Sequence, residues 1–211
     1  MNKFFVSFLA FVFSFSLHAQ GFKVSSSGEK TFDFTDKGKR NQASFFSTTP
    51  LEDITGLTND VNGKVSLKVN DIKSLKGELS VSTASIKTGI DLRDEHLRDE
   101  NWLDATKYPN IKFTLKEVSD VKQLADNRLQ IKFSGDFTLK GVTKEISGDA
   151  TLTYLVESEQ TKQRAPGDLL GVQAKFKVNL SDFGIKNQII GQKVAEVVDV
   201  SVNMVGSSSS K

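Results

Sequence analysis

The sequence predicts an all-β fold: an antiparallel, eight-stranded closed barrel with one short helix as a lid. The main observation is the alternation of apolar and polar residues with a period of two, which is typical of strands with one dry and one wet face. Residues 131–139 show the pattern most clearly, as IKFSGDFTL. The second observation is that only one segment has a helical pattern. About eight or nine such strands are expected, which is enough to close a barrel.

Alternation of this kind recurs along the chain after residue 30. The expected strands lie at about residues 31–34, 43–49, 65–69, 79–81, 111–115, 131–139, 150–156, 172–180 and 198–204. Turn signals rich in Gly, Asn, Asp and Pro separate them. They are Asn62-Gly63, Lys76-Gly77, Asp126-Asn127, Lys140-Gly141 and Ala165-Pro166-Gly167-Asp168.

The single helix is expected from about Leu92 to Thr106. Asp91 can cap its first turn, and Asp94 and Arg98 have the i,i+4 spacing of an ion pair. Pro109 prevents the helix from continuing. One short helix among many antiparallel strands is the arrangement expected of a lid over one end of a barrel.

The first nineteen residues predict a secretory signal peptide. Lys3 is their only charged residue, residues 4–17 carry no charge, and His18-Ala19 precede Gln20. The apolar run is shorter than the roughly 20 residues that a transmembrane helix needs. No cysteine follows the expected cut after Ala19, which excludes a lipoprotein-type anchor. The expected organisation is a signal peptide over 1–19, one barrel domain over 20–206 and a flexible tail over 207–211.

The composition excludes several classes of partner. Removing Lys3 from the 28 basic side chains leaves 27 against 26 acidic ones, so we expect no nucleic-acid partner and no anionic membrane surface. The chain has no cysteine, which removes disulfides, thiolate metal sites and cysteine nucleophiles together. Phenylalanine is common, with 16 residues against 2 tyrosines and 1 tryptophan. The same scarcity of Trp and Tyr argues against an outer-membrane barrel, which needs two aromatic girdles.

Nothing in the sequence predicts an enzyme. His96 is the one histidine after the predicted signal peptide, so a metal site with two histidines cannot be assembled, and a triad would have only His96 as its base. The chain contains no G-x-S-x-G elbow, phosphate loop or dinucleotide fingerprint. We expect no catalytic residue, no metal and no cofactor, and a hydrolase whose site escapes these patterns remains the less favoured alternative.

The strongest functional signal is a set of motifs in a fixed order. They are SIKTG at 85–89, RDEHL at 93–97, WLD at 102–104, YPNIKF at 108–113, GDFTLKGVTK at 135–144, and SDFGI at 181–185 followed by Ile190-Gly191. The set resembles the YceI-like family, the secreted lipocalin-like barrels that bind polyisoprenoids and other long-chain amphiphiles. The resemblance covers about residues 61–205, and it implies that Arg93 and Asp94 hold the lid segment on the barrel rim.

The apolar strand faces allow either an ordinary packed core or a ligand cavity. An eight-stranded barrel is just wide enough for one ligand, and the inward set mixes large rings with Gly135 and Ala174. The resemblance favours the cavity and implies an isoprenoid or quinone-like lipid. We expect the lining to contain Phe113, Phe133, Phe137, Phe176, Phe183 and Ile185, with Leu97, Trp102 and Leu103 in the lid.

The sequence therefore predicts an exported, periplasmic or secreted, carrier of a long-chain lipid or isoprenoid amphiphile, with no stable membrane insertion. A homodimer is compatible with this prediction. The alternative from a different class is an interaction or stress-related β-module with a filled core and no ligand.

The signal-like segment yields the first prediction. We expect the exported protein to begin at Gln20 or within a few residues of it, because the apolar run and small residue match a signal-peptidase site. The intact mass of the exported protein measures the cleavage point. A soluble protein that retains residues 1–17 would contradict the predicted localisation.

Overall fold

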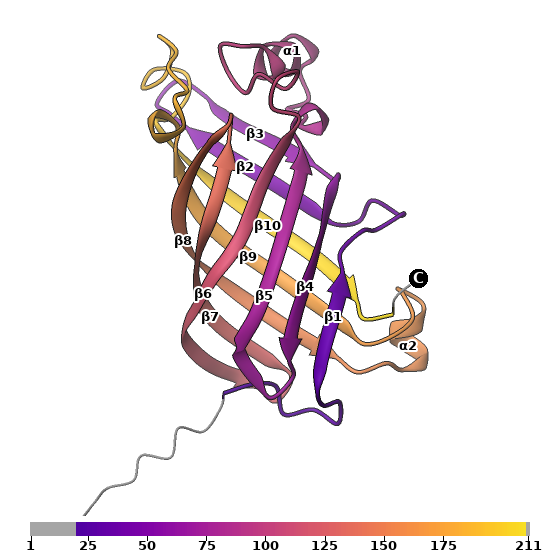
Figure 1. Cartoon of the computed structure of the whole chain (residues 1–211). Coiled ribbons are helices and arrows are strands. Elements are labelled where there is room, and N and C mark those ends of the chain that lie inside the picture. Colours follow the sequence, from indigo (N-terminus) through magenta and orange to yellow (C-terminus); the bar gives the residue numbers. More distant parts are fainter. Residues whose placement is uncertain (1–19, 210–211) are drawn as a thin grey trace, which may run out of the picture.

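The computed structural model describes residues 20–209, so the predicted signal peptide lies outside the described residues (Figure 1). Ten strands form one antiparallel sheet, which closes because β1 also pairs with β10. The strands are β1 (Glu29–Asp33), β2 (Gln42–Thr48), β3 (Asp53–Thr58), β4 (Val61–Lys68), β5 (Asp71–Ser82), β6 (Asn110–Ala125), β7 (Arg128–Leu139), β8 (Val142–Leu155), β9 (Leu169–Asn179) and β10 (Val197–Ser207). The helices are α1 (Asp91–Arg98) and α2 (Glu159–Lys162), with short 3-10 turns η1 (Thr83–Ser85) and η2 (Leu180–Phe183).

The ten strands occupy eight positions in the barrel wall. β1 and β2 both run antiparallel to β10, so they are two halves of one position interrupted by residues 34–41. β3 pairs with β2, and β4 pairs with β1 and β5, so β3 and β4 form a second divided position. The other six positions are single strands. The predicted eight-stranded closed antiparallel barrel is confirmed.

The predicted strand phase is also confirmed, most clearly in β7. Ile131, Phe133 and Phe137 are buried, whereas Lys132 between them is exposed. The inward phenylalanines meet edge to face: the ring centroids of Phe113 on β6 and Phe133 on β7 are 5.6 Å apart, and those of Phe137 on β7 and Phe176 on β9 are 5.4 Å apart across β8. Such pairs contribute about 0.5–1.5 kcal/mol beyond the area they bury. The rings therefore pack together inside the barrel and stabilise the wall formed by β6 to β9.

One end of the barrel is closed by the chain that follows residue 19. Phe22 is buried against Tyr154, with ring centroids 5.3 Å apart, and Phe32 meets the same tyrosine edge to face at 5.7 Å. The Tyr154 hydroxyl donates to the Asp168 carboxylate at 2.6 Å, and the Ser26 hydroxyl donates to the same oxygen at 2.7 Å. Burial is the main cause that raises the pKa of Tyr154 above its ordinary value, and the hydrogen bond to the Asp168 carboxylate raises it further. These contacts anchor the segment around Ser26 to the closed end of the barrel.

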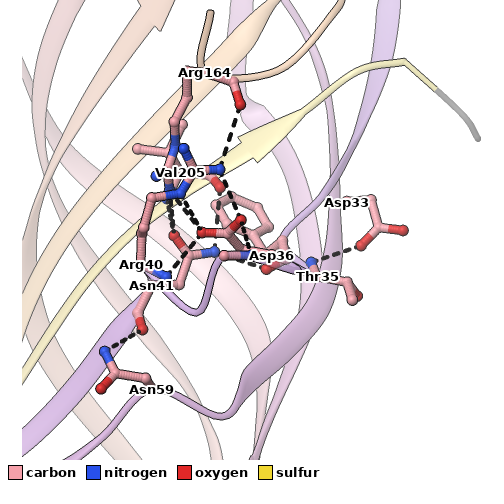
Figure 2. Close-up of polar contacts among 10 residues, drawn as sticks. Asp33, Thr35, Asp36, Arg40, Asn41, Asn59, Arg164 and Val205 are labelled. Atoms are coloured by element: carbon pink, nitrogen blue, oxygen red, sulfur yellow. Dashed lines mark hydrogen bonds and ion pairs between the residues drawn. The ribbon is translucent and has the colours of Figure 1, made fainter.

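Closure at the divided position depends on the buried side chain of Asn41. β1 and β10 share only the pair Asp33 and Ser207 in register. Next to this pair, the Asn41 amide nitrogen donates to the Phe34 carbonyl at 2.7 Å and to the Val205 carbonyl at 3.2 Å, and its oxygen accepts from the Val205 N–H at 2.8 Å (Figure 2). The side-chain amide thus replaces the backbone pairing that the interruption removes.

Charged residues cover this junction from outside. The Asp36 carboxylate accepts from the Arg40 guanidinium at 2.9 Å and 3.0 Å, and from that of Arg164 at 3.1 Å (Figure 2). Arg164 also donates to the Asn41 oxygen at 3.3 Å. The hydrogen bonds from Arg40 outweigh the opposing effect of burial and hold the pKa of Asp36 well below its ordinary value. The Asp36 carboxylate therefore stays ionised and ties the interrupted strand to the segment after α2.

The lid helix is shorter than the sequence predicts. It ends at Arg98 instead of Thr106, because Asp99 adopts an extended backbone and residues 99–108 continue as turns. The N-cap is Ile90, and the expected cap Asp91 is the first helical residue. The i,i+4 spacing predicts that Asp94 pairs with Arg98. In the structure the Asp94 carboxylate instead accepts hydrogen bonds from Thr88. A contact with the loop that precedes the helix has displaced the pair along the helix.

Two of the predicted turns are wrong for a common reason. Asn62-Gly63 lies inside β4 and Lys76-Gly77 lies inside β5. A Cβ on Gly63 would lie 2.2 Å from the Glu78 carbonyl oxygen, so the glycine permits a close approach of two strands. The predicted turn at Lys140-Gly141 is confirmed, since both residues have positive φ angles. The sequence also missed β3, and β10 extends to Ser207, into the segment predicted to be a flexible tail.

The strand phase predicts a large difference between adjacent substitutions in β7. Phe133→Gln should lower the free energy of unfolding by about 3–5 kcal/mol, because it removes a buried ring and places an unpaired amide in the core. Lys132→Gln removes only an exposed ion pair with Asp120 and should cost about 1 kcal/mol or less. Denaturant midpoints measure both, and equal losses would show that the assigned phase is wrong.

Candidate ligand-binding site

The barrel encloses an apolar cavity of about 520 Å³. Its walls come from every strand position and from the lid segment, and it reaches from α1 at one end to Leu152 and Leu170 on β8 and β9. The opposite end is blocked by the buried rings of Phe22, Phe32 and Tyr154, which do not line it. The cavity therefore has one closed end and one mouth, and the mouth lies at the end of the barrel that carries α1. Figure 1 shows α1 at the top of the barrel.

Eight of the nine residues that the sequence predicts at the site line the cavity. They are Leu97, Trp102, Leu103, Phe113, Phe133, Phe137, Phe176 and Ile185. Phe183 is the exception, because its ring packs against Phe137 at a centroid distance of 5.6 Å and does not reach the cavity wall. Leu97, Trp102 and Leu103 belong to the lid segment at the mouth, as expected from their sequence position.

The structure corrects one argument for the cavity. Gly135 was expected to leave room inside the barrel, but a Cβ there would lie 2.6 Å from the Phe113 ring and 2.4 Å from the Thr114 carbonyl oxygen. The glycine therefore accommodates the ring of the neighbouring strand. Gly135 does not line the cavity, whereas Ala174, the other small residue of that argument, does.

Asp94 anchors the lid helix to the rim. Its carboxylate is buried and accepts from the Thr88 backbone N–H at 2.6 Å and from the Thr88 hydroxyl at 2.7 Å, with the Lys87 ammonium 3.6 Å away. Burial alone would raise the pKa of Asp94, but the hydrogen bonds from Thr88 and the charge of Lys87 outweigh it and lower the pKa below its ordinary value. The carboxylate is ionised at neutral pH, and this contact weakens only as the pH falls through that lowered pKa.

Further contacts hold the rest of the lid segment. The Arg93 guanidinium donates to the Glu52 carboxylate at 3.2 Å, which joins α1 to the connection between β2 and β3. The Lys140 ammonium donates to the Glu100 carbonyl at 2.8 Å. The Thr83 hydroxyl donates to the Tyr108 carbonyl at 2.8 Å. The contacts of Arg93 and Asp94 match the rim-holding role that the family resemblance implies.

A second loop, residues 186–196, completes the mouth. Ile189 and Val194 line the cavity, and the Ala195 N–H donates to the buried Ser47 hydroxyl of β2 at 2.8 Å. Sequence reasoning missed this loop, because it has no period to reveal which side chains face inward. It also missed Ile90 and Leu92 at the start of the lid. Leu152 and Met204 line the cavity too, and the alternation in their strands could have identified them.

The charged groups of the lining gather at the mouth. Glu52 and Arg93 lie there with the imidazole of His96, and Lys112 lies near the start of β6, whereas the deep wall is made of aliphatic and aromatic side chains. Across residues 20–209, His, Cys, Asp and Glu side chains nowhere gather in the threes that a metal ion would need. In the same part of the chain, no helix has the length and apolar character required to cross a bilayer. The arrangement suits an elongated apolar group with a polar end at the mouth.

Comparison with known proteins identifies the family. The model of the YceI-like domain matches residues 16–206. The chain belongs to the YceI-like family. A UPF0312 protein of Pseudomonas fluorescens is 35% identical over 131 residues, which are 62% of this chain and just under two thirds, 64%, of that relative. Protein YceI of Shigella flexneri is 30% identical over 151 residues, 72% of each chain.

Solved structures of YceI-like and related proteins share the fold. BcnA of Burkholderia cenocepacia has a TM-score of 0.63 at 15% identity, covering 79% of this chain and 96% of its own. The Campylobacter jejuni YceI protein has a TM-score of 0.62 at 20% identity, covering 78% and 90%. A domain from Saccharophagus degradans, described as polyisoprenoid binding and implicated in plant cell wall breakdown, has a TM-score of 0.63 at 14% identity, covering 86% and 100%. At these identities the likeness establishes the fold alone.

Proposed function

We propose that this protein is an exported carrier that holds one long-chain amphiphile, an isoprenoid or quinone-like lipid, inside its barrel. The observation that carries the proposal is the apolar cavity, closed at one end and covered at the other by a lid. Its volume of about 520 Å³ falls among those of small-molecule sites, roughly 300–1,000 Å³. The description of the Saccharophagus degradans domain as polyisoprenoid binding supports the choice of ligand class.

The energetics support a hydrocarbon ligand. Each methylene group that moves from water into an apolar cavity contributes about 0.8 kcal/mol, so a long chain needs few directional contacts to bind tightly. The deep wall offers such contacts from residues such as Leu152, Leu170 and Met204. A ligand of this kind would also stabilise the folded chain, which has no disulfide.

Export is the part of the proposal that rests on the sequence of residues 1–19. A lipid carrier outside the cytoplasm would collect or deliver ligands that water cannot transport. The signal-like segment, with its single cation and uncharged run, supports this location.

Two other functions compete with the carrier role. A filled-core module would explain the aromatic contacts but not the volume left between them. A hydrolase would need a nucleophile activated by a base. Within residues 20–209, the imidazole of His96, the sole histidine there, makes no hydrogen bond to a serine or threonine. The cavity therefore favours the carrier.

Trp102 provides the direct test. The ring lines the cavity at the mouth and is partly exposed, so an entering chain should displace water from it. Adding an isoprenoid quinone analogue that does not absorb near the emission band to delipidated protein should shift the tryptophan emission to shorter wavelength until it saturates. A flat response would contradict the carrier role for that ligand.

Substitution of the same residue adds a control. Trp102→Ala should weaken ligand retention by about 1–3 kcal/mol, because the ring no longer covers the chain, while the barrel remains folded. Leu124→Ala removes a side chain that is 44% exposed on β6, outside the cavity lining, and should leave retention unchanged. Retention is measured by quantifying the lipid that stays bound during gel filtration. Equal retention in both variants would show that the ligand does not lie beneath Trp102.

A further inference from the structure

The cations nearest the cavity mouth are already paired with carboxylates. The Arg93 guanidinium lies 3.2 Å from the Glu52 carboxylate, and both side chains are partly buried, with 29% and 38% of their surface exposed. The Lys87 ammonium lies 3.6 Å from the buried carboxylate of Asp94. Arg93 and Lys87 therefore each have a carboxylate within 4 Å.

The remaining charges at the mouth do not favour an anion either. Lys112 contributes to the cavity lining, but its side chain is exposed. It lies between the inward-facing Ile111 and Phe113, so alternation directs its ammonium to the outer surface of β6. The α1 helix, DLRDEHLR, carries three carboxylates against two guanidinium groups. Over the whole lid segment 87–108, six carboxylates stand against four cations, and the loop 186–196 adds two lysines and one glutamate. The end of the barrel where a ligand's polar group must lie is therefore close to neutral.

We propose that the mouth selects a ligand with a neutral, oxygen-bearing head group, such as an alcohol or a quinone, and rejects the corresponding phosphate. The assignment rests on the proposed function and specifies its ligand. Arg93 donates to the neutral oxygen of the head group, and Glu52 excludes the anion. His96, which also lines the mouth, supplies a further polar contact for the head group.

The chemistry of the pair explains the selection. A guanidinium group has five N–H donors in a rigid fork, and one is directed at Glu52, so others can donate to a carbonyl or hydroxyl oxygen. A phosphate at the same place would meet the Glu52 carboxylate in a partly desolvated site, where like charges repel more strongly than in water. To bind there it would have to break the ion pair, and a neutral oxygen would not.

The test compares two ligands with the same chain. Delipidated protein is titrated with geranylgeraniol and with geranylgeranyl phosphate, and the emission of Trp102 reports binding. The wild-type protein should bind the alcohol about tenfold more tightly than the phosphate or better. Glu52→Gln should remove this preference by strengthening phosphate binding about tenfold, because it frees the charge of Arg93, while binding of the alcohol changes little.

Glu95→Gln is the matched control. It removes the same charge from an exposed position of α1 with no ion pair in the described structure, and it should leave the preference for the alcohol in place. Phosphate binding by the wild-type protein that equals or exceeds alcohol binding would overturn this inference and leave the carrier role standing. Equal effects of Glu52→Gln and Glu95→Gln would overturn the role of the pair. If neither ligand binds, the proposed function fails, and the head-group assignment fails with it.

Discussion

The closing of the sheet is the constraint on which the rest of the molecule depends. A barrel keeps water from its interior only if its first and last strands meet, and here β1 and β10 share a single pair in register. Asn41 supplies the missing pairing with its side-chain amide, and Arg164 joins it to Asp36 on the outside. A buried amide is costly unless its donors and acceptors are all engaged, and these contacts engage them. Because this junction closes the wall, the barrel can stay folded although side chains do not fill its apolar interior.

The two ends of the barrel have opposite chemistry, and this difference gives the cavity its direction. At the closed end, Tyr154 and Asp168 anchor the N-terminal segment, and aromatic rings fill the space. At the mouth, the lid is held through contacts such as those of Asp94 with Thr88 and Arg93 with Glu52, and the wall retains open space. A chain-like ligand thus has one orientation that places its polar end near polar groups.

The fold was largely predictable from the sequence, because alternation reports directly which residues face inward. It located strands such as β7 and β9 together with the lining residues Phe133 and Phe176. Several of the failures arise because contacts outside the local pattern override its signals. Gly63 resembles a turn residue but allows two strands to approach closely.

The mouth was less predictable than the wall for the same reason. Asp94 pairs with Thr88 across the rim instead of with Arg98 along the helix, and α1 ends early as a result of the turns that follow it. The loop that contributes Ile189 has no periodicity from which its orientation could be inferred. The pairing of Glu52 with Arg93 joins residues 41 positions apart, and only the folded chain reveals it. The head-group end of the site therefore depends on the structure, whereas its hydrophobic part follows from the pattern.

The central claim is that the space inside the barrel belongs to a ligand. Its most direct test is to purify the exported protein without detergent, extract it with organic solvent and identify the extract by mass spectrometry. A carrier should release a long-chain lipid in an amount close to one molecule per protein chain. An extract without such a lipid, from protein that also fails to take up an isoprenoid when one is supplied, would show that the barrel is a filled-core module and would contradict the account.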